Sequence, residues 1–147
     1  MPYRWFLLGL SQENSPMRKE GFIMSATKYV GKMYTAEQVC SMLNISSEGL
    51  QDLVQNNMIL RLTNNNGQEG YPVFQFDDES INPDVQQVIK ILLGGGYDPI
   101  TAAFWIYRPS ELMDGMNTIE YMADSKNNKD FMVALAKQDI ANLRANF

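Results

Sequence analysis

Residues 33–55 read MYTAEQVCSMLNISSEGLQDLVQ and indicate two short helices in succession. Thr35 is a favoured N-cap residue, and apolar residues follow it at helical spacing as far as Leu43. Asn44 interrupts this pattern, and the serine at 46 or 47 caps a second helix with apolar positions at Leu50, Leu53 and Val54. Two helices joined by so short a turn predict a helix-turn-helix unit.

A two-stranded wing is predicted directly after this unit. Residues 58–62 (MILRL) are expected to form one strand, and residues 71–76 (YPVFQF) to form the returning strand. The polar residues 63–70 between them contain an Asn-Gly step, which is typical of a hairpin turn. Pro72 confines the second strand to a sheet edge or to its own first residues. Phe74 and Phe76 are expected to be buried and to join the wing to the helices that follow.

The chain from Asp77 onward is predicted to be wholly helical. Asn82-Pro83 and Asp98-Pro99 each place a capping residue before a proline at the first helical position. Gly94-Gly95-Gly96 ends the first of these helices, and Arg108-Pro109 ends the second. Two further helices are expected, one from Thr118 and one after Asn127-Asn128.

The fold class predicted from these patterns is mainly α. An N-terminal helix-turn-helix unit with a two-stranded β wing precedes a small helical domain. The predicted organisation is an extension or linker at residues 1–23, the winged unit at residues 24–76 and the helical domain at residues 77–147.

Composition excludes several classes of function. The 147 residues include no histidine and a single cysteine, Cys40. Ser-His-Asp and Cys-His triads, and zinc sites that contain histidine, are therefore ruled out. We expect no catalytic residue, no metal, no cofactor and no enzymatic activity. One cysteine allows no internal disulfide and favours the cytoplasm, and no segment has the roughly 20 apolar residues of a membrane span.

The charge distribution disfavours tight binding to nucleic acid. The 12 basic and 17 acidic residues give a net charge of −5, and no segment forms a basic arm. Glu48 and Asp52 lie on the presumed recognition helix, which carries no Lys or Arg. DNA binding is therefore expected to be weak and to need a homo-oligomer such as a dimer. The candidate DNA contacts are Ser46, Ser47, Gln51, Gln55 and Arg61.

A resemblance to a known family rests on two stretches taken together. The first is the YPVFQF segment at residues 71–76. The second runs from Asp98-Pro99 to Glu120, and its motif positions, which are expected to support the fold, are Trp105, Pro109, Leu112, Gly115 and Ile119. Together they resemble the toxin-binding domain of the Xre/MbcA/ParS-type antitoxins, many of which carry an N-terminal helix-turn-helix. This sequence has Asn117-Thr118 where the family has Thr-Pro.

The resemblance implies an antitoxin that neutralises a cognate toxin by direct binding. The family's known toxins include NAD-degrading enzymes of the RES type, and autoregulation of transcription is part of the same expectation. In this family the C-terminal part of the antitoxin can enter or cover the active-site cleft of the toxin. The toxin-binding residues expected here lie on the last helix and are Lys137, Ile140, Asn142, Leu143, Arg144 and Phe147.

Two alternatives remain open from the sequence. The apolar stripe of the last helix, through Ile140 and Leu143, is also typical of a helix that packs on the core of its own domain. The whole chain is also compatible with a small DNA-binding transcriptional regulator of the excisionase or MerR type. In that interpretation the helical tail serves only for dimerisation.

Overall fold

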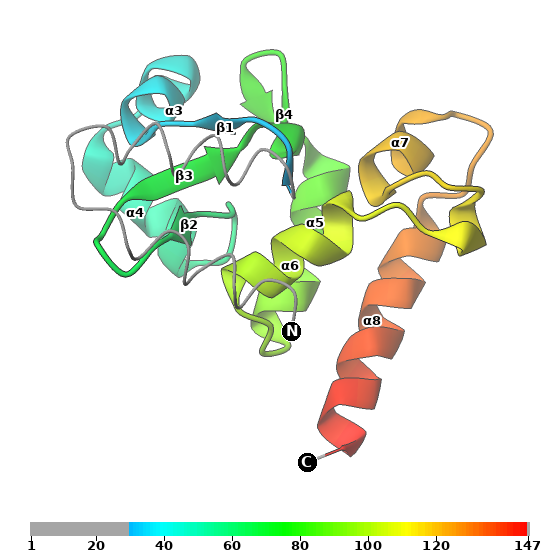
Figure 1. Cartoon of the computed structure of the whole chain (residues 1–147). Coiled ribbons are helices and arrows are strands. Elements are labelled where there is room, and N and C mark those ends of the chain that lie inside the picture. Colours follow the sequence, from blue (N-terminus) through cyan, green and yellow to red (C-terminus); the bar gives the residue numbers. More distant parts are fainter. Residues whose placement is uncertain (1–29, 147) are drawn as a thin grey trace.

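Helices dominate residues 30–146, the part of the chain that the structure describes, in this computed structural model (Figure 1). The predicted mainly helical class with a small β component is therefore confirmed. The predicted extension at residues 1–23 and the candidate residue Phe147 lie outside the described residues. Two antiparallel sheets accompany the helices, and their strands are β1 (Met33–Tyr34), β2 (Leu62–Thr63) and β3 (Glu69–Pro72) in one, and β4 (Phe76–Asp77) and β5 (Ser80–Ile81) in the other.

The helices α3 (Ala36–Leu43) and α4 (Ser47–Gln55) form where the sequence predicts them. Thr35 and Gln38 make a capping box, in which each side chain accepts the backbone N–H of the other residue at 3.2 and 2.8 Å. Asn44 ends α3 with a φ of 55°, a left-handed conformation that asparagine tolerates better than most residues. The short connection lays α4 beside α3 (Figure 1).

The strands differ from the predicted pair in length and position. The strand predicted at 58–62 was wrong in its bounds, because only Leu62 and the next residue pair with β3. The strand predicted at 71–76 is divided, since β3 ends at Pro72 and a 3₁₀ turn covers Val73–Gln75 before β4 begins. The hairpin predicted between β2 and β3 is present, and its turn contains Gly67 with a φ of 79°.

The side chain of Gln75 explains why residues 58–61 form no strand. It is fully buried, and its Oε1 accepts the Leu60 N–H at 2.8 Å while its Nε2 donates to the Leu60 carbonyl at 3.0 Å. The same Nε2 donates to the Pro72 carbonyl at 3.1 Å. Leu60 thus pairs both of its backbone groups with a side-chain amide instead of a neighbouring strand. The backbone around Leu60 needs no strand partner as a result.

Pro72 ends the central strand of its sheet, so the prediction that it lies at an edge or at the start of a strand was wrong. Strand β2 pairs with Glu69 and Gly70, whereas β1 pairs with Tyr71 and Pro72. Pro72 therefore faces only one neighbouring strand. Because β2 does not pair with Pro72, the absence of an N–H group on the proline costs no hydrogen bond to that strand.

Phe74 and Phe76 are half-buried, which corrects the prediction that both are core residues. The Phe74 ring stacks on Tyr107 with centroids 5.6 Å apart, and the Phe76 and Tyr34 rings form an edge-to-face pair with centroids 5.7 Å apart. The 3₁₀ turn breaks the alternation of a strand. The residue between the two rings, Gln75, consequently takes the interior position.

The second half of the chain is helical apart from the β4–β5 hairpin. Asn82 and Asp98 cap helices with proline in the first turn, as predicted. Asn117 and Glu120 form a second capping box, and a 3₁₀ turn lies at Glu111–Met113. The helices are α5 (Pro83–Gly94), α6 (Pro99–Tyr107), α7 (Thr118–Ala123) and α8 (Asp130–Ala145).

One hydrophobic cluster crosses the predicted boundary between residues 76 and 77. It combines Met33, Leu60 and Leu62 from the first half with the buried faces of α5, α6 and α8. A smaller cluster lies between α3, α4 and β3 and is built on Val39, Leu50, Ile59 and Tyr71. The buried stripe predicted for α5 is confirmed and consists of Val85, Val88, Ile89 and Leu92.

Candidate interaction surfaces

The residues predicted to contact DNA lie on α4 and beside the hairpin of β2 and β3. Ser47, Gln51 and Gln55 are exposed on α4, and the Ser46 hydroxyl accepts the Gly49 N–H at 3.0 Å as the cap of that helix. The structure therefore places these side chains on one short helix. Their role toward DNA stays a prediction.

Arg61, the one cation among these candidates, is already engaged within the protein. Its Nη1 donates to Gln51 Oε1 at 2.8 Å and lies 3.0 Å from Glu69 Oε2. Burial raises the pKa of the nearby Tyr71 phenol above its ordinary value, and the charge of Glu69 adds to that shift, while Arg61 opposes it. Arg61 thus ties α4 to β3.

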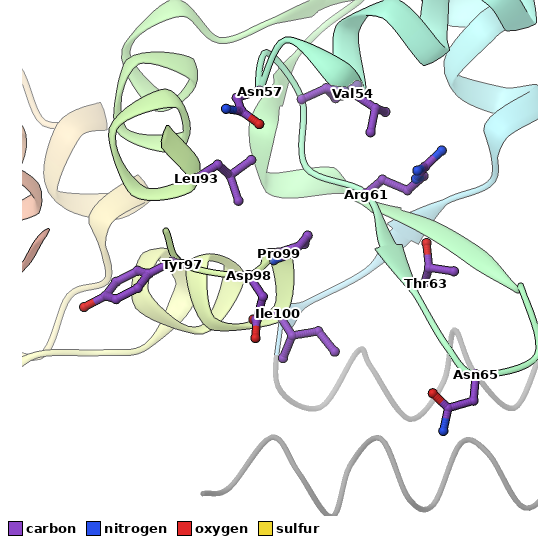
Figure 2. A pocket seen from close by; sticks show the side chains of 11 residues that line it. Val54, Asn57, Arg61, Thr63, Asn65, Leu93, Tyr97, Asp98, Pro99 and Ile100 are labelled. Atoms are coloured by element: carbon purple, nitrogen blue, oxygen red, sulfur yellow. The ribbon is translucent and has the colours of Figure 1, made fainter. Parts of the chain in front are cut away.

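A cavity of 440 Å³ separates this part of the molecule from α5 and α6 (Figure 2). Val54 and Arg61 lie on one side of it, and Leu93 and Pro99 lie on the other. Its two charged side chains already have structural roles, since Arg61 bonds to Gln51 and Glu69 and the Asp98 carboxylate caps α6 at Thr101 N–H. The cavity therefore lies at the boundary between residues 54–65 and residues 93–100.

A groove of 360 Å³ lies between α5 and α8 and has a strongly basic lining. Lys90 from α5 and Lys137 and Arg144 from α8 surround it, and all three are exposed. None of the three forms an ion pair with another residue in the range 30–146. No carboxylate lines the groove, although the whole chain carries a net charge of −5.

The other toxin-contact candidates on α8 have different positions. Ile140 is buried, and its side chain packs so closely on Gly95 that a Cβ there would meet it at 2.5 Å. The apolar stripe of α8 therefore packs on the protein's own core, as the alternative interpretation predicted. Leu143 is half-buried, and exposed Asn142 accepts a hydrogen bond from Gln138 at 3.1 Å.

The motif residues between α6 and α7 form a well-defined turn. Trp105 is half-buried and donates its indole N–H to the Asp139 carboxylate of α8. Pro109 follows α6 at the surface, Gly115 has a φ of 84°, and Ile119 packs against the core. Leu112 is 76% exposed, so the expectation that it supports the fold was wrong, because the 3₁₀ turn points its neighbour Met113 inward instead.

Burial also acts on a phenol at the start of α6. It raises the pKa of Tyr97 above its ordinary value, the nearby charge of Asp139 adds to that shift, and Arg108 opposes it. Asp139 therefore acts on two side chains, because it accepts the Trp105 indole N–H and its charge also affects the Tyr97 phenol. Sequence reasoning missed Asp139, Lys90 and Gln75, whose roles depend on contacts between distant segments.

The acidic side chains and the helices of residues 30–146 bear on two other kinds of function. No group of three or more Cys, Asp or Glu side chains there is placed to hold a metal ion. No helix in that range has the length and apolar character needed to cross a membrane.

The arrangement defines a mainly helical protein with small antiparallel sheets, and one solved structure shares it. The NMR structure of Rv2175c is similar with a TM-score of 0.53, over 77% of this chain and 79% of that chain, at 13% sequence identity. At so low an identity the similarity concerns the fold alone. No protein-family model and no curated protein sequence matches the chain.

Proposed function

We propose that this chain is a non-enzymatic interaction protein of the antitoxin type, which neutralises a partner toxin by direct binding. The groove between α5 and α8 is the surface that contacts the partner. The family resemblance suggests a toxin of the RES type that degrades NAD. The proposal joins that resemblance to the position of Lys137 and Arg144.

The observation that carries the proposal is the concentration of cations in this groove. Lys90, Lys137 and Arg144 line the groove together with glycine, isoleucine and alanine residues, and no acidic side chain belongs to the lining. Arginine is enriched at protein interfaces, which favours Arg144 as a contact residue. An acidic segment of the partner fits such a groove by charge complementarity.

Charge reversal tests the groove directly. The chain is co-expressed with the product of the adjacent gene, and the affinity of the purified pair is measured by calorimetry. Lys137→Glu with Lys90→Glu should weaken binding by at least tenfold, because two attractive contacts become repulsive. Lys32→Glu with Lys126→Glu changes the net charge equally at exposed positions outside the groove and should leave the affinity within about threefold. Equal affinity of both double variants for the partner would place the contact elsewhere.

A second candidate function has its own support. The α3–turn–α4 unit followed by the β2–β3 hairpin has the order of elements of a winged helix-turn-helix, in which the second helix enters the major groove. The exposed polar face of α4 offers Ser47, Gln51 and Gln55. A DNA-binding regulator of the excisionase or MerR type, acting as a dimer, is the function that this observation favours.

The DNA-binding candidate is tested by a gel-shift assay with competitor DNA. A gel-shift assay with the chain's own promoter region measures the apparent affinity between about 50 and 200 mM salt. Specific binding that survives excess competitor DNA supports DNA binding by the chain, as a regulator or as an autoregulating antitoxin. Retardation that disappears with competitor leaves the partner-binding function alone.

A further inference from the structure

A separate cavity of 120 Å³ lies beneath the connection between α6 and α7. Its apolar lining includes Trp105, Met132 and Leu135. Its polar lining includes Thr118 and Asp139. The cavity exceeds the volume of roughly 30 Å³ that one water occupies in the liquid, so it has room for a small group with an apolar stem.

Thr118 supplies an unusual feature of this cavity. Its side chain is fully buried, and its Oγ1 has no hydrogen-bond partner among residues 30–146. Buried hydroxyls are nearly always hydrogen-bonded, because desolvation without a partner is unfavourable. Thr118 lines the cavity, so a group bound there would offer this hydroxyl the partner that it lacks.

Asp139 supplies a second acceptor. Its Oδ2 accepts the indole N–H of Trp105, which fixes the carboxylate at the cavity wall. Its other oxygen has no hydrogen bond to any described residue. Three side chains with oxygen atoms, those of Ser110, Thr118 and Asp139, thus line the cavity, and apart from Arg108 its remaining walls are aromatic and aliphatic.

We propose that this cavity binds an alkylammonium group, with the ammonium at Asp139 and Thr118 and the methylene stem along Trp105 and Leu135. An ammonium carries three donors and no acceptor, which suits a site lined by oxygen atoms. The indole face favours a nearby cation, and methylene groups pack well on apolar walls. Arg108 also lines the cavity, but it is exposed, so water screens its charge more than that of half-buried Asp139.

The source that we assign to this group is a lysine side chain of a partner protein. Leu112, 76% exposed, lines the same cavity on a turn held by the Ser110–Met116 bridge, and it offers an apolar contact beside the entering lysine. The assignment of a protein as the source rests on the proposed function. The preference of the cavity for an ammonium group does not.

Titration of the full chain with n-butylammonium chloride tests the site by itself. The indole N–H signal of Trp105, identified with a Trp105→Phe variant, is followed by NMR at constant ionic strength. We expect a saturable shift, and at least tenfold weaker binding of n-butanol, which has the same stem and no charge. Asp139→Asn should weaken butylammonium binding by at least tenfold, and Thr118→Val by about tenfold.

Asp130→Asn is the matched control, because it removes the same charge at an exposed position on the same helix. It should change the butylammonium affinity by less than about twofold. Absence of a saturable shift, equal binding of butanol, or equal losses in the Asp130 and Asp139 variants would overturn the proposal. If Asp139→Asn does not fold, Thr118→Val decides, since unchanged affinity there contradicts the site. Toxin neutralisation does not enter this assay, so its failure is distinguishable from failure of the proposed function.

Discussion

At the scale of single residues, one buried amide decides how the first half of the chain meets the second. Gln75 satisfies both backbone groups of Leu60 and the carbonyl of Pro72. Leu60 itself belongs to the hydrophobic cluster that α5, α6 and α8 share. The hydrogen bonds of Gln75 therefore hold the connection after α4 against the main core.

Replacing Gln75 should destabilise the protein markedly. Gln75→Met keeps the length of the side chain but leaves the Leu60 N–H and carbonyl buried without partners, so we expect a loss of about 2–4 kcal/mol. Gln87→Met is the matched control at an exposed position of α5 and should change stability by less than about 0.5 kcal/mol. Urea unfolding followed by circular dichroism measures both. Equal midpoints for the two variants would contradict the structural role of Gln75.

The phenol of Tyr71 should make stability fall at alkaline pH. Its pKa is raised in the folded protein, mainly by burial, so the folded state keeps its proton where the unfolded state loses it. The contribution of this phenol to the free energy of unfolding is fully present below about pH 10, the ordinary pKa of tyrosine. It decreases as the pH rises through the pKa of Tyr71 in the folded protein. Tyr71→Phe should flatten this alkaline decrease in urea midpoints between pH 8 and 11. An unchanged pH profile would contradict the assignment.

Residue-level patterns in the sequence predicted the caps well and the buried polar groups poorly. Thr35, Asn82 and Asp98 all cap helices as expected, because a cap depends on neighbours two or three residues away. The role of Gln75 depends on a residue fifteen positions away. A strand pattern places glutamine between two phenylalanines on the outer face, which is why Phe74 and Phe76 were expected inside.

At the scale of elements, the packing of α8 on α5 is the contact that builds the basic groove. Gly95, at the end of α5, allows Ile140 of α8 to approach the backbone closely. A larger residue at that position would push α8 outward. The spacing of Lys90 from Lys137 and Arg144 therefore depends on a glycine that the sequence marked only as a helix end.

Gly95→Ala should lower the free energy of unfolding by about 1–3 kcal/mol, because the new methyl group overlaps Ile140. Gly94→Ala, one residue earlier, meets nothing within 4 Å and should stabilise the helix by up to about 1 kcal/mol. Thermal unfolding of the two variants gives the comparison. An Ile140→Ala change should cost less in the Gly95→Ala background than in the wild type. Additive effects of the two changes would show that the contact is not made.

The sequence pattern of the last helix predicted the basic residues that α8 contributes to the groove, but not the one that α5 contributes. The polar side of the last helix singled out Lys137 and Arg144 because they share one helical face. Lys90 lies on a different helix. The periodicity within one helix does not reveal which basic residues of two packed helices lie close together. The same limit explains Ile140, whose burial against Gly95 only the packing of α8 on α5 determines.

At the scale of the whole molecule, the two candidate surfaces lie on opposite sides of α5 and α6. Figure 1 shows α3 and α4 on one side and α8 on the other. The net charge of −5 opposes DNA binding, while the groove beside α8 concentrates three cations locally. A partner on α8 and a DNA duplex on α4 would not compete for the same surface.

The charge of α4 should control any affinity for DNA. The wild-type chain should bind a short duplex weakly at about 150 mM salt, because Glu48 and Asp52 repel phosphate. Glu48→Lys with Asp52→Lys should raise the affinity at least tenfold and steepen its salt dependence. Asp124→Lys with Asp130→Lys changes the net charge equally, away from α4, and should raise it much less. Fluorescence anisotropy measures all three, and equal gains would contradict docking through α4.

Growth rescue tests the central claim most directly. The product of the adjacent gene is induced together with either the wild-type chain or the Lys137→Glu, Arg144→Glu variant, and growth is followed after induction. Antitoxin-type binding through the groove between α5 and α8 predicts that the wild type restores growth. It also predicts that the folded variant, expressed at the same level, does not. Full rescue by the variant would contradict the account. So would a failure of the wild type to restore growth when the product of the adjacent gene is toxic.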